Sequence, residues 1–237
     1  MEHKQLALQP RLHMLAQLVP EDCRLTDVGT DHGYLPVSLL QQGRIPSAIA
    51  SDIGAEPLEH ARRTAMQYGV TDIDFRLCPG LSAIAPEETD VIVIAGMGGE
   101  TIIAILQAAP WTKDGRHTLL LQPMTKAADL RHWLADNGYT FTGEHLVEDK
   151  GRLYPILIVT GGTHRPLTEA EALCGVLLAD DPLYDACLSE HAAKLRRSAE
   201  GLRRSSNPDA AAQAAHMDAL AEELEQKRCK VSGGEAL

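Results

Sequence analysis

An acidic, glycine-containing turn, residues 27–33 (DVGTDHG), offers side chains that could bind a charged ligand. Glycine after a strand lets the backbone pass close to a ligand, because it carries no side chain. A pyrophosphate site would instead need the spacing G-x-G-x-x-G facing a helix N-terminus, and Asp27 and Asp31 would repel that anion. Two carboxylates suit a cofactor with cationic groups, such as the ammonium and sulfonium of S-adenosylmethionine. We therefore expect this turn to hold such a cofactor, unless Asp31 merely caps the next helix.

A further carboxylate follows in residues 51–53 (SDI). Asp52 comes about twenty residues after the glycine turn, at the expected end of a second strand, where a lone carboxylate can accept both ribose hydroxyls of a nucleotide-like cofactor. Ile53 could then cover one face of the adenine. The sequence thus predicts that Asp52 and Ile53 bind the nucleoside part of the cofactor.

The segment AGMGGET (95–101) is rich in glycine and follows an expected fourth strand. In the α/β sheet of a methyltransferase, the loop after the fourth strand faces the methyl group of S-adenosylmethionine. No Pro-Cys pair occurs in the sequence, which disfavours a covalent pyrimidine adduct. The Asn-Pro-Pro-Tyr and Asp-Pro-Pro-Tyr motifs used on exocyclic amines are also missing. A glycine-rich loop would let a flat ring approach closely, although a tight strand-to-helix turn explains the same residues.

The elements that must position these residues alternate between short β-branched runs and helical stretches up to about residue 160. This alternation predicts a doubly wound α/β sheet with helices on both faces. The expected strands are residues 24–28, 48–53, 73–77, 90–95 and 118–122, and the expected helices are residues 35–42, 57–68, 99–107 and 126–137. Residues 141–148 and 153–160 then form a hairpin around Asp149-Lys150-Gly151. A terminal antiparallel hairpin is typical of the class I (Rossmann-like) methyltransferase sheet and not of a plain dinucleotide-binding fold.

Beyond Gly161-Gly162 the pattern is helical, so we expect two domains, residues 1–162 and 163–237. Thr168 and Glu171 form a capping box, and Pro182 is expected at the first position of a second helix. Small and apolar residues then recur at steps of three and four before and after a turn at residues 206–208. This spacing predicts a coiled-coil-like antiparallel helical hairpin.

Composition limits the partners. The 237 residues carry a formal net charge of −11, which disfavours nucleic acid in general. Basic residues nevertheless cluster on the expected helical hairpin, where they either bind RNA or form the solvated faces of helices. The five cysteines and ten histidines lack the spacing of metal ligands, so we expect no metal site and a reducing cytoplasm. No apolar run has membrane-spanning length, and residues 1–4 (MEHK) do not resemble a signal peptide.

Several segments together resemble the bacterial tRNA (adenine(22)-N1)-methyltransferases, which modify the D arm. They are DVGTDHGYLP (27–36), AIASDI (48–53), PLEHAR (57–62), AGMGG (95–99), LLLQP (119–123) and LVEDKGRLYPILIV (146–159). The chain departs from the family where Cys78-Pro79-Gly80-Leu81 replaces Gly-Asp-Gly-Leu, where Met124 replaces an asparagine and where Pro155 replaces an acidic residue. The first departure removes a carboxylate expected on the cofactor's adenine amino group, so either backbone groups near Cys78–Leu81 substitute or the affinity for the cofactor is weaker.

The resemblance implies S-adenosylmethionine as cofactor and tRNA as partner, with a monomer or weak dimer as the working assembly. The residues it assigns to the cofactor are Asp27, Gly29, Asp31, His32, Asp52, Ile53, Cys78, Gly80, Gly96, Met97 and Gly98. The basic residues expected to bind RNA are Arg11, Arg196, Arg197, Arg203 and Arg204.

The implied reaction is an in-line displacement at the sulfonium methyl by adenine N1, whose in-plane lone pair needs neither a metal nor a covalent intermediate. The base must first be unpaired or extruded, because N1 lies on its Watson–Crick edge. Asp31 is our candidate to stabilise the resulting positive charge, and Gln122 is our candidate to hydrogen-bond the base. Two alternatives stay open: a methyltransferase acting on a small metabolite, and a cofactor-binding scaffold in tRNA folding.

Overall fold

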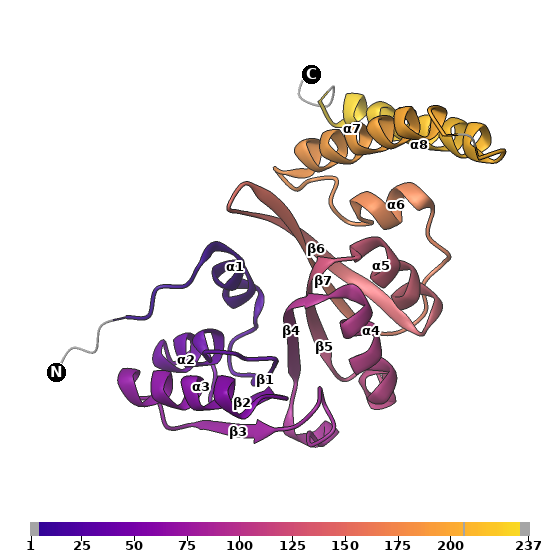
Figure 1. Ribbon diagram of the computed structural model, residues 1–237. Coiled ribbons are helices and arrows are strands. Elements are labelled where there is room, and N and C mark those ends of the chain that lie inside the picture. Colours follow the sequence, from indigo (N-terminus) through magenta and orange to yellow (C-terminus); the bar gives the residue numbers. More distant parts are fainter. Residues whose placement is uncertain (1–4, 206, 233–237) are drawn as a thin grey trace. The chain divides into compact units, whose positions relative to one another are not determined.

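The structure is a computed structural model that describes residues 5–205 and 207–232 (Figure 1). The N-terminal residues 1–4, compared above with a signal peptide, and Ser206 of the expected turn lie outside the described residues. The chain divides into two compact units, the first ending at Pro166 and the second beginning at Leu167. None of the described helices combines the length and the apolar character that crossing a membrane requires.

The first unit is built on a seven-stranded sheet with the order β3-β2-β1-β4-β5-β7-β6. Strands β1 to β5 are parallel, whereas β7 runs antiparallel to both β5 and β6. The expected doubly wound sheet with a terminal hairpin is therefore confirmed. The strands are β1 (Arg24–Val28), β2 (Ser47–Asp52), β3 (Ile73–Leu77), β4 (Val91–Gly98), β5 (Thr118–Thr125), β6 (Tyr139–Asp149) and β7 (Arg152–Gly161).

Helices cover both faces of this sheet. Figure 1 shows α1, α2 and α3 on one face and α4 and α5 on the other. Their bounds are α1 (Pro10–Leu18), α2 (Tyr34–Gln41), α3 (Ala55–Tyr68), α4 (Gly99–Ala108) and α5 (Ala127–Asp136), with short 3₁₀ turns at Pro86–Glu88 and Pro110–Lys113. Helix α1 is not predictable from the sequence pattern, because its nine residues hold too few periodic positions to stand out.

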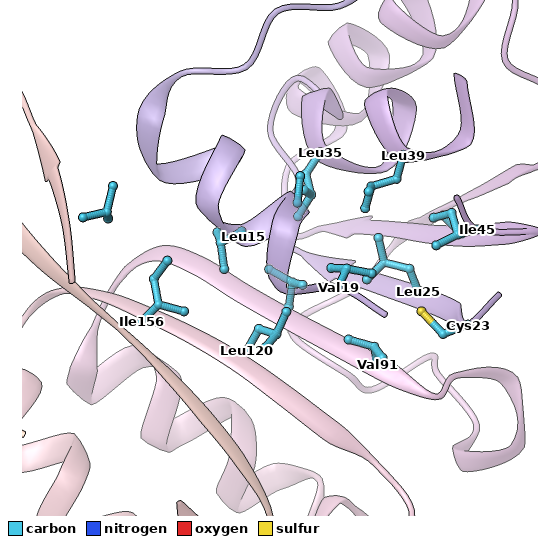
Figure 2. Packing of buried hydrophobic residues seen from close by; sticks show 14 residues of the cluster. Leu15, Val19, Cys23, Leu25, Leu35, Leu39, Ile45, Val91, Leu120 and Ile156 are labelled. Atoms are coloured by element: carbon cyan, nitrogen blue, oxygen red, sulfur yellow. The ribbon is translucent and has the colours of Figure 1, made fainter. Parts of the chain in front are cut away.

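An aliphatic core fixes α1 and α2 against the sheet (Figure 2). Leu15 from α1 and Leu35 from α2 are almost fully buried in one cluster with Leu25 of β1 and Leu120 of β5. Burying a leucine side chain stabilises a fold by roughly 1.5–3 kcal/mol. This packing determines where the start of α1, and with it Arg11, lies relative to the ends of the strands.

The glycine-rich segment after β4 is not the simple loop that the sequence suggested. Strand β4 continues to Gly98 and pairs with β5 beyond the expected end at Ala95. The register shifts between Ala95 and Met97, so Gly96 has no partner across the strands. Gly96 has φ +77°, and a Cβ there would meet nothing within 4 Å. The bulge thus opens space at this edge of the sheet.

The β6–β7 hairpin turns at Lys150 and Gly151, as the sequence indicated. Both residues have positive φ, which is typical of the two-residue turns that suit hairpin twist. Asp149 therefore pairs with Arg152 across the turn.

The second unit contains α6 (Glu169–Cys174), α7 (Tyr184–Arg203) and α8 (Ala210–Ser232). The predicted capping box at Thr168 is present. Pro182, however, is not the first residue of α7, because the chain first makes a turn in which the Leu183 amide donates to the Asp181 carboxylate. Ion pairs of Arg196 with Glu225 and of Arg228 with Asp185 show that α7 and α8 run antiparallel.

Candidate active site

A cavity of about 520 Å³ lies at the carboxyl ends of β1, β4 and β5, where α/β sheets bind their ligands. Its volume falls within the range of small-molecule sites. The lining comes from the start of α1, from β1 and the turn after it, from the start of α2, and from β4 and β5: Gln9, Arg11, Leu12, Asp27, Gly29, Thr30, Asp31, His32, Tyr34, Leu35, Ala95, Gly96, Gln122 and Met124. The structure thus gathers predicted residues from four separate segments, around Arg11, Asp27, Gly96 and Gln122, about one space.

Asp27 is the buried acidic group of this cavity, with 6% of its surface exposed. Burial raises the pKa of its carboxyl to about 6, although a hydrogen bond from Thr30 (2.6 Å) favours the ionised form. The negative charge of Asp52 raises this pKa further. Because burial and a neighbouring negative charge both disfavour the ionised form, a cationic ligand would stabilise the Asp27 carboxylate strongly.

Gly29 lies directly under the side chain of Met97. Its φ is +71°, and a Cβ at this position would come within 2.1 Å of the Met97 Cε atom. A side chain at residue 29 would therefore both strain the backbone and displace Met97. Position 29 therefore requires glycine, the residue without a side chain.

Asp31 does not cap α2. The N-cap residue is Gly33, and no side-chain hydrogen bond caps the helix. The Asp31 side chain is instead 69% exposed on the rim of the cavity, 3.8 Å from the His32 Nε2 atom. The His32 ring stacks on Tyr34 and on His60 of α3. Ligand atoms of Asp31, His32 and His60 approach within 4.8 Å of one another, although this rim is open to solvent.

The remaining residues assigned to the cofactor lie at the ends of β2, β3 and β4, outside the residues that line the cavity. Asp52 is half-buried, and its Oδ1 atom accepts the Gly54 amide at 2.8 Å. Its own carbonyl accepts the Cys78 amide, which joins the ends of β2 and β3. Ile53 and Leu77 are 77% and 61% exposed here, an apolar surface suited to an adenine ring. Sequence reasoning missed Leu77.

The Cys78–Gly80 turn has no side-chain carboxylate, and its polar groups bond within the protein. The Gly80 carbonyl accepts from the Ser51 hydroxyl at 3.4 Å and lies 3.6 Å from the Cys78 Sγ atom. Cys78 itself is buried. Met97 and Gly98 are the last residues of β4, on the other side of β1 in the sheet.

Arg11 brings α1, β5 and the β6–β7 hairpin together at the cavity. Its Nε atom donates to Asp149 Oδ2 at 2.8 Å, and its Nη1 atom donates to Gln122 Oε1 at 3.1 Å. The guanidinium also lies 5.2 Å from the Tyr154 ring centroid and contacts the Met124 sulfur at 3.1 Å. Asp149 and Tyr154 belong to the resembling segment 146–159, which was the available signal for both residues.

Gln122 is fully buried, and protein groups occupy its amide. Its Oε1 atom also accepts the Gly96 amide at 3.2 Å, while its Nε2 atom donates to the Pro123 carbonyl at 3.1 Å. Hydrogen bonding to a base edge would require an exchange of these partners. The geometry favours a role in holding Arg11 and the Gly96 bulge in place.

Comparisons with known proteins identify the family. The family model described as "Methyltransferase domain" matches residues 8–157. The tRNA (adenine(22)-N(1))-methyltransferase of Bacillus subtilis (strain 168) is 35% identical over 159 residues, which cover 67% of each chain. This chain belongs to the tRNA (adenine(22)-N1)-methyltransferase family.

Solved structures extend the family match over both units. The B. subtilis m1A22 tRNA methyltransferase TrmK has a TM-score of 0.80 at 27% identity, covering 95% of this chain and 99% of that one. Streptococcus pneumoniae Sp1610, crystallised with S-adenosyl-L-methionine, has a TM-score of 0.78 at 31% identity, covering 90% of this chain and 97% of that one. The m1A22 family therefore includes a relative with the cofactor bound.

The residues of this chain fit the cofactor of the m1A22 family. Asp27 supplies a buried carboxylate for a cationic group, and the Gly96 bulge leaves open space beside it. The exposed side chains of Ile53 and Leu77 supply an apolar surface near Asp52. Each part of an amino-acid-linked nucleoside thus meets a group of suitable chemistry.

The basic residues expected to bind RNA differ in their surroundings. Arg196 pairs with Asp218 and Glu225, and Arg203 also pairs with Asp218, so α8 holds both guanidinium groups. Arg197 and Arg204 are exposed, and within the described part of the chain no ion pair involves them. Arg11 lies in the cavity instead of on an open surface.

Proposed function

We propose that this chain transfers the methyl group of S-adenosylmethionine to N1 of adenine 22 in tRNA. The observation that carries this proposal is the cavity at the carboxyl edge of the sheet, in which a buried carboxylate and an arginine network meet in a chain of the m1A22 family. A cytoplasmic location follows from this substrate.

Asp27 would bind the ammonium group of the cofactor's amino-acid part. Asp52 would accept its ribose hydroxyls, while Ile53 and Leu77 would cover the adenine. The bound cofactor supplies a methyl group on a sulfonium, an electrophile that needs no activation by the protein. The chain's contribution to the chemistry is therefore mainly orientation and exclusion of water.

The target adenine would enter beside Arg11 and the Gly96 bulge. Asp31, exposed on the rim, would stabilise the positive charge that methylation places on the ring. We now assign Gln122 a positioning role, because its amide already bonds Gly96, Arg11 and Pro123. This departs from the sequence-based expectation that Gln122 reads the base.

The helical unit would contact tRNA phosphates away from the target base. Lys194 and Arg197 lie three residues apart on α7, and its C-cap residue Arg204 follows seven residues later in helical conformation, so the three side chains share one face. All three are exposed. We therefore restrict the predicted RNA surface on α7 to this stripe, since Arg196 and Arg203 bond to acidic residues of α8.

The decisive experiment uses the full chain, methyl-labelled S-adenosylmethionine and two tRNA transcripts that differ only in carrying adenine or guanine at position 22. We expect 1-methyladenosine in the first transcript and none in the second, detected by mass spectrometry of digested nucleosides. Modification at another position would refute the assignment. Cofactor binding without label in either transcript would instead support the small-metabolite or the scaffold alternative.

A further inference from the structure

Three metal-ligating side chains meet in the second unit, outside the candidate active site. Cys174 is the last residue of α6, while Cys187 and His191 lie one turn apart on α7. One ligand atom from each residue lies within 4.8 Å of the other two. Both cysteines are thiols with only 1% and 6% of their surface exposed, and His191 is half-buried.

This donor set has the chemistry of a zinc site. Two thiol sulfurs and one imidazole nitrogen are ligands that zinc prefers, and bonds of about 2.3 Å to sulfur and about 2.0 Å to nitrogen place tetrahedral ligand atoms about 3.5–4 Å apart. Small side-chain adjustments would therefore let one ion contact all three residues. We propose that Cys174, Cys187 and His191 bind one zinc ion, with water or another ligand in the fourth position.

The spacing of these residues in the sequence predicted no metal site. The fold, however, brings the end of α6 against the first turns of α7, a juxtaposition that spacing along the chain does not record. The other cluster, Asp31 with His32 and His60, lacks sulfur and is open to solvent, so it is a weaker zinc ligand set.

A zinc ion would have a clear structural effect in this unit. Units of this size bury too little apolar surface to be strongly stable, and metals often compensate. Many of the buried side chains described in this unit are alanines, which are small: Ala170, Ala172, Ala192, Ala199, Ala210, Ala214 and Ala221. The ion would tie α6, only six residues long, to the longer α7. Binding free energy would then add to the stability of the folded unit.

The test uses the full chain, reduced, stripped with a chelator and dialysed. Cobalt(II) is added as a spectroscopic probe, followed by zinc. We expect one cobalt per chain, with the visible absorption of tetrahedral cobalt bound to thiolate, full displacement by zinc, and a higher melting temperature with zinc. His191→Ala and Cys187→Ser should each weaken zinc binding by about tenfold or more, since even the partners of metal ligands have effects of that size.

Two matched controls locate the ion. Cys23→Ser removes another buried thiol and His60→Ala removes a ligand of the other cluster, so both should leave zinc affinity unchanged. The wild-type cobalt spectrum decides the question even if a variant fails to fold. Absence of cobalt uptake, a spectrum without thiolate ligation, or affinity unchanged in Cys187→Ser would overturn the proposal. Formation of a Cys174–Cys187 disulfide by a mild oxidant, with no metal uptake in the reduced protein, would also overturn it.

Discussion

Replacing Asp27 with asparagine should have two separate effects: it should remove the destabilisation that comes from burying this charge, and it should weaken binding of the cofactor. The folded protein raises the pKa of Asp27 from its ordinary value of 3.8 to about 6. Between about pH 4 and pH 6 the folded chain therefore keeps a proton that the unfolded chain has released. Stability must then fall as the pH rises through this window, by about 1.4 kcal/mol for each pH unit. At neutral pH, ionisation of the buried Asp27 carboxyl therefore lowers the free energy of unfolding by about 3 kcal/mol.

Asp27→Asn has no such titration, and its amide can still accept the Thr30 hydroxyl. The difference in unfolding free energy, variant minus wild type, should therefore grow by about 3 kcal/mol between about pH 4 and pH 7. Denaturant unfolding at a series of pH values measures this change. The part of this free-energy difference that does not change with pH reflects the burial of an amide in place of a carboxyl. Only the part that changes with pH therefore tests whether burial raises the pKa of Asp27.

The same substitution should weaken binding of S-adenosylmethionine by about tenfold or more, since hydrogen bonds to a charged group are worth roughly 1.5–3 kcal/mol. Calorimetric titration measures this loss. Asp136→Asn, an exposed carboxylate at the end of α5 and outside the cavity lining, controls for the change in net charge. A stability difference that stays constant from pH 4 to pH 7 would refute the argument from burial. Unchanged cofactor affinity would remove Asp27 from the site.

Three further predictions follow from the geometry. Asp52→Ala should lower cofactor affinity by about tenfold or more in calorimetry, through loss of a charged acceptor for the ribose hydroxyls; an unchanged affinity in a folded protein would exclude Asp52. Arg11→Ala should reduce methyl transfer far more than cofactor binding, because Arg11 contacts the acceptor side of the cavity; equal losses in both assays would place it with the cofactor instead. The double substitution of Arg197 and Arg204 by alanine should flatten the log–log salt dependence of tRNA binding by about two units, whereas Arg203→Ala should change it little. Equal slopes for these two variants would mean that α7 contacts no phosphates through this stripe.

The sequence by itself determined the sheet and the acidic glycine turn that lines the cavity. Strands β4 and β5 contain contiguous apolar runs, and β3 alternates apolar with charged residues. The turn residues from Asp27 to Gly33 are neighbours in the chain, so local patterns suffice to recognise these features. The β6–β7 turn was recognisable for the same reason, since Lys150 and Gly151 adopt the positive φ that the hairpin needs. The position of α7 was predicted to within two residues, because its periodic seam is long.

Only the tertiary structure decided which distant residues meet. Arg11 bonds Asp149 across 138 residues of chain, through a short helix whose place depends on the buried Leu15. No local pattern records such a contact, because it results from packing of α1 against the sheet. Tertiary packing likewise set the partners of Gln122 and brought Cys174 to Cys187. Local periodicity thus specifies elements, whereas the chemistry of a site depends on how burial of their apolar faces arranges them in space.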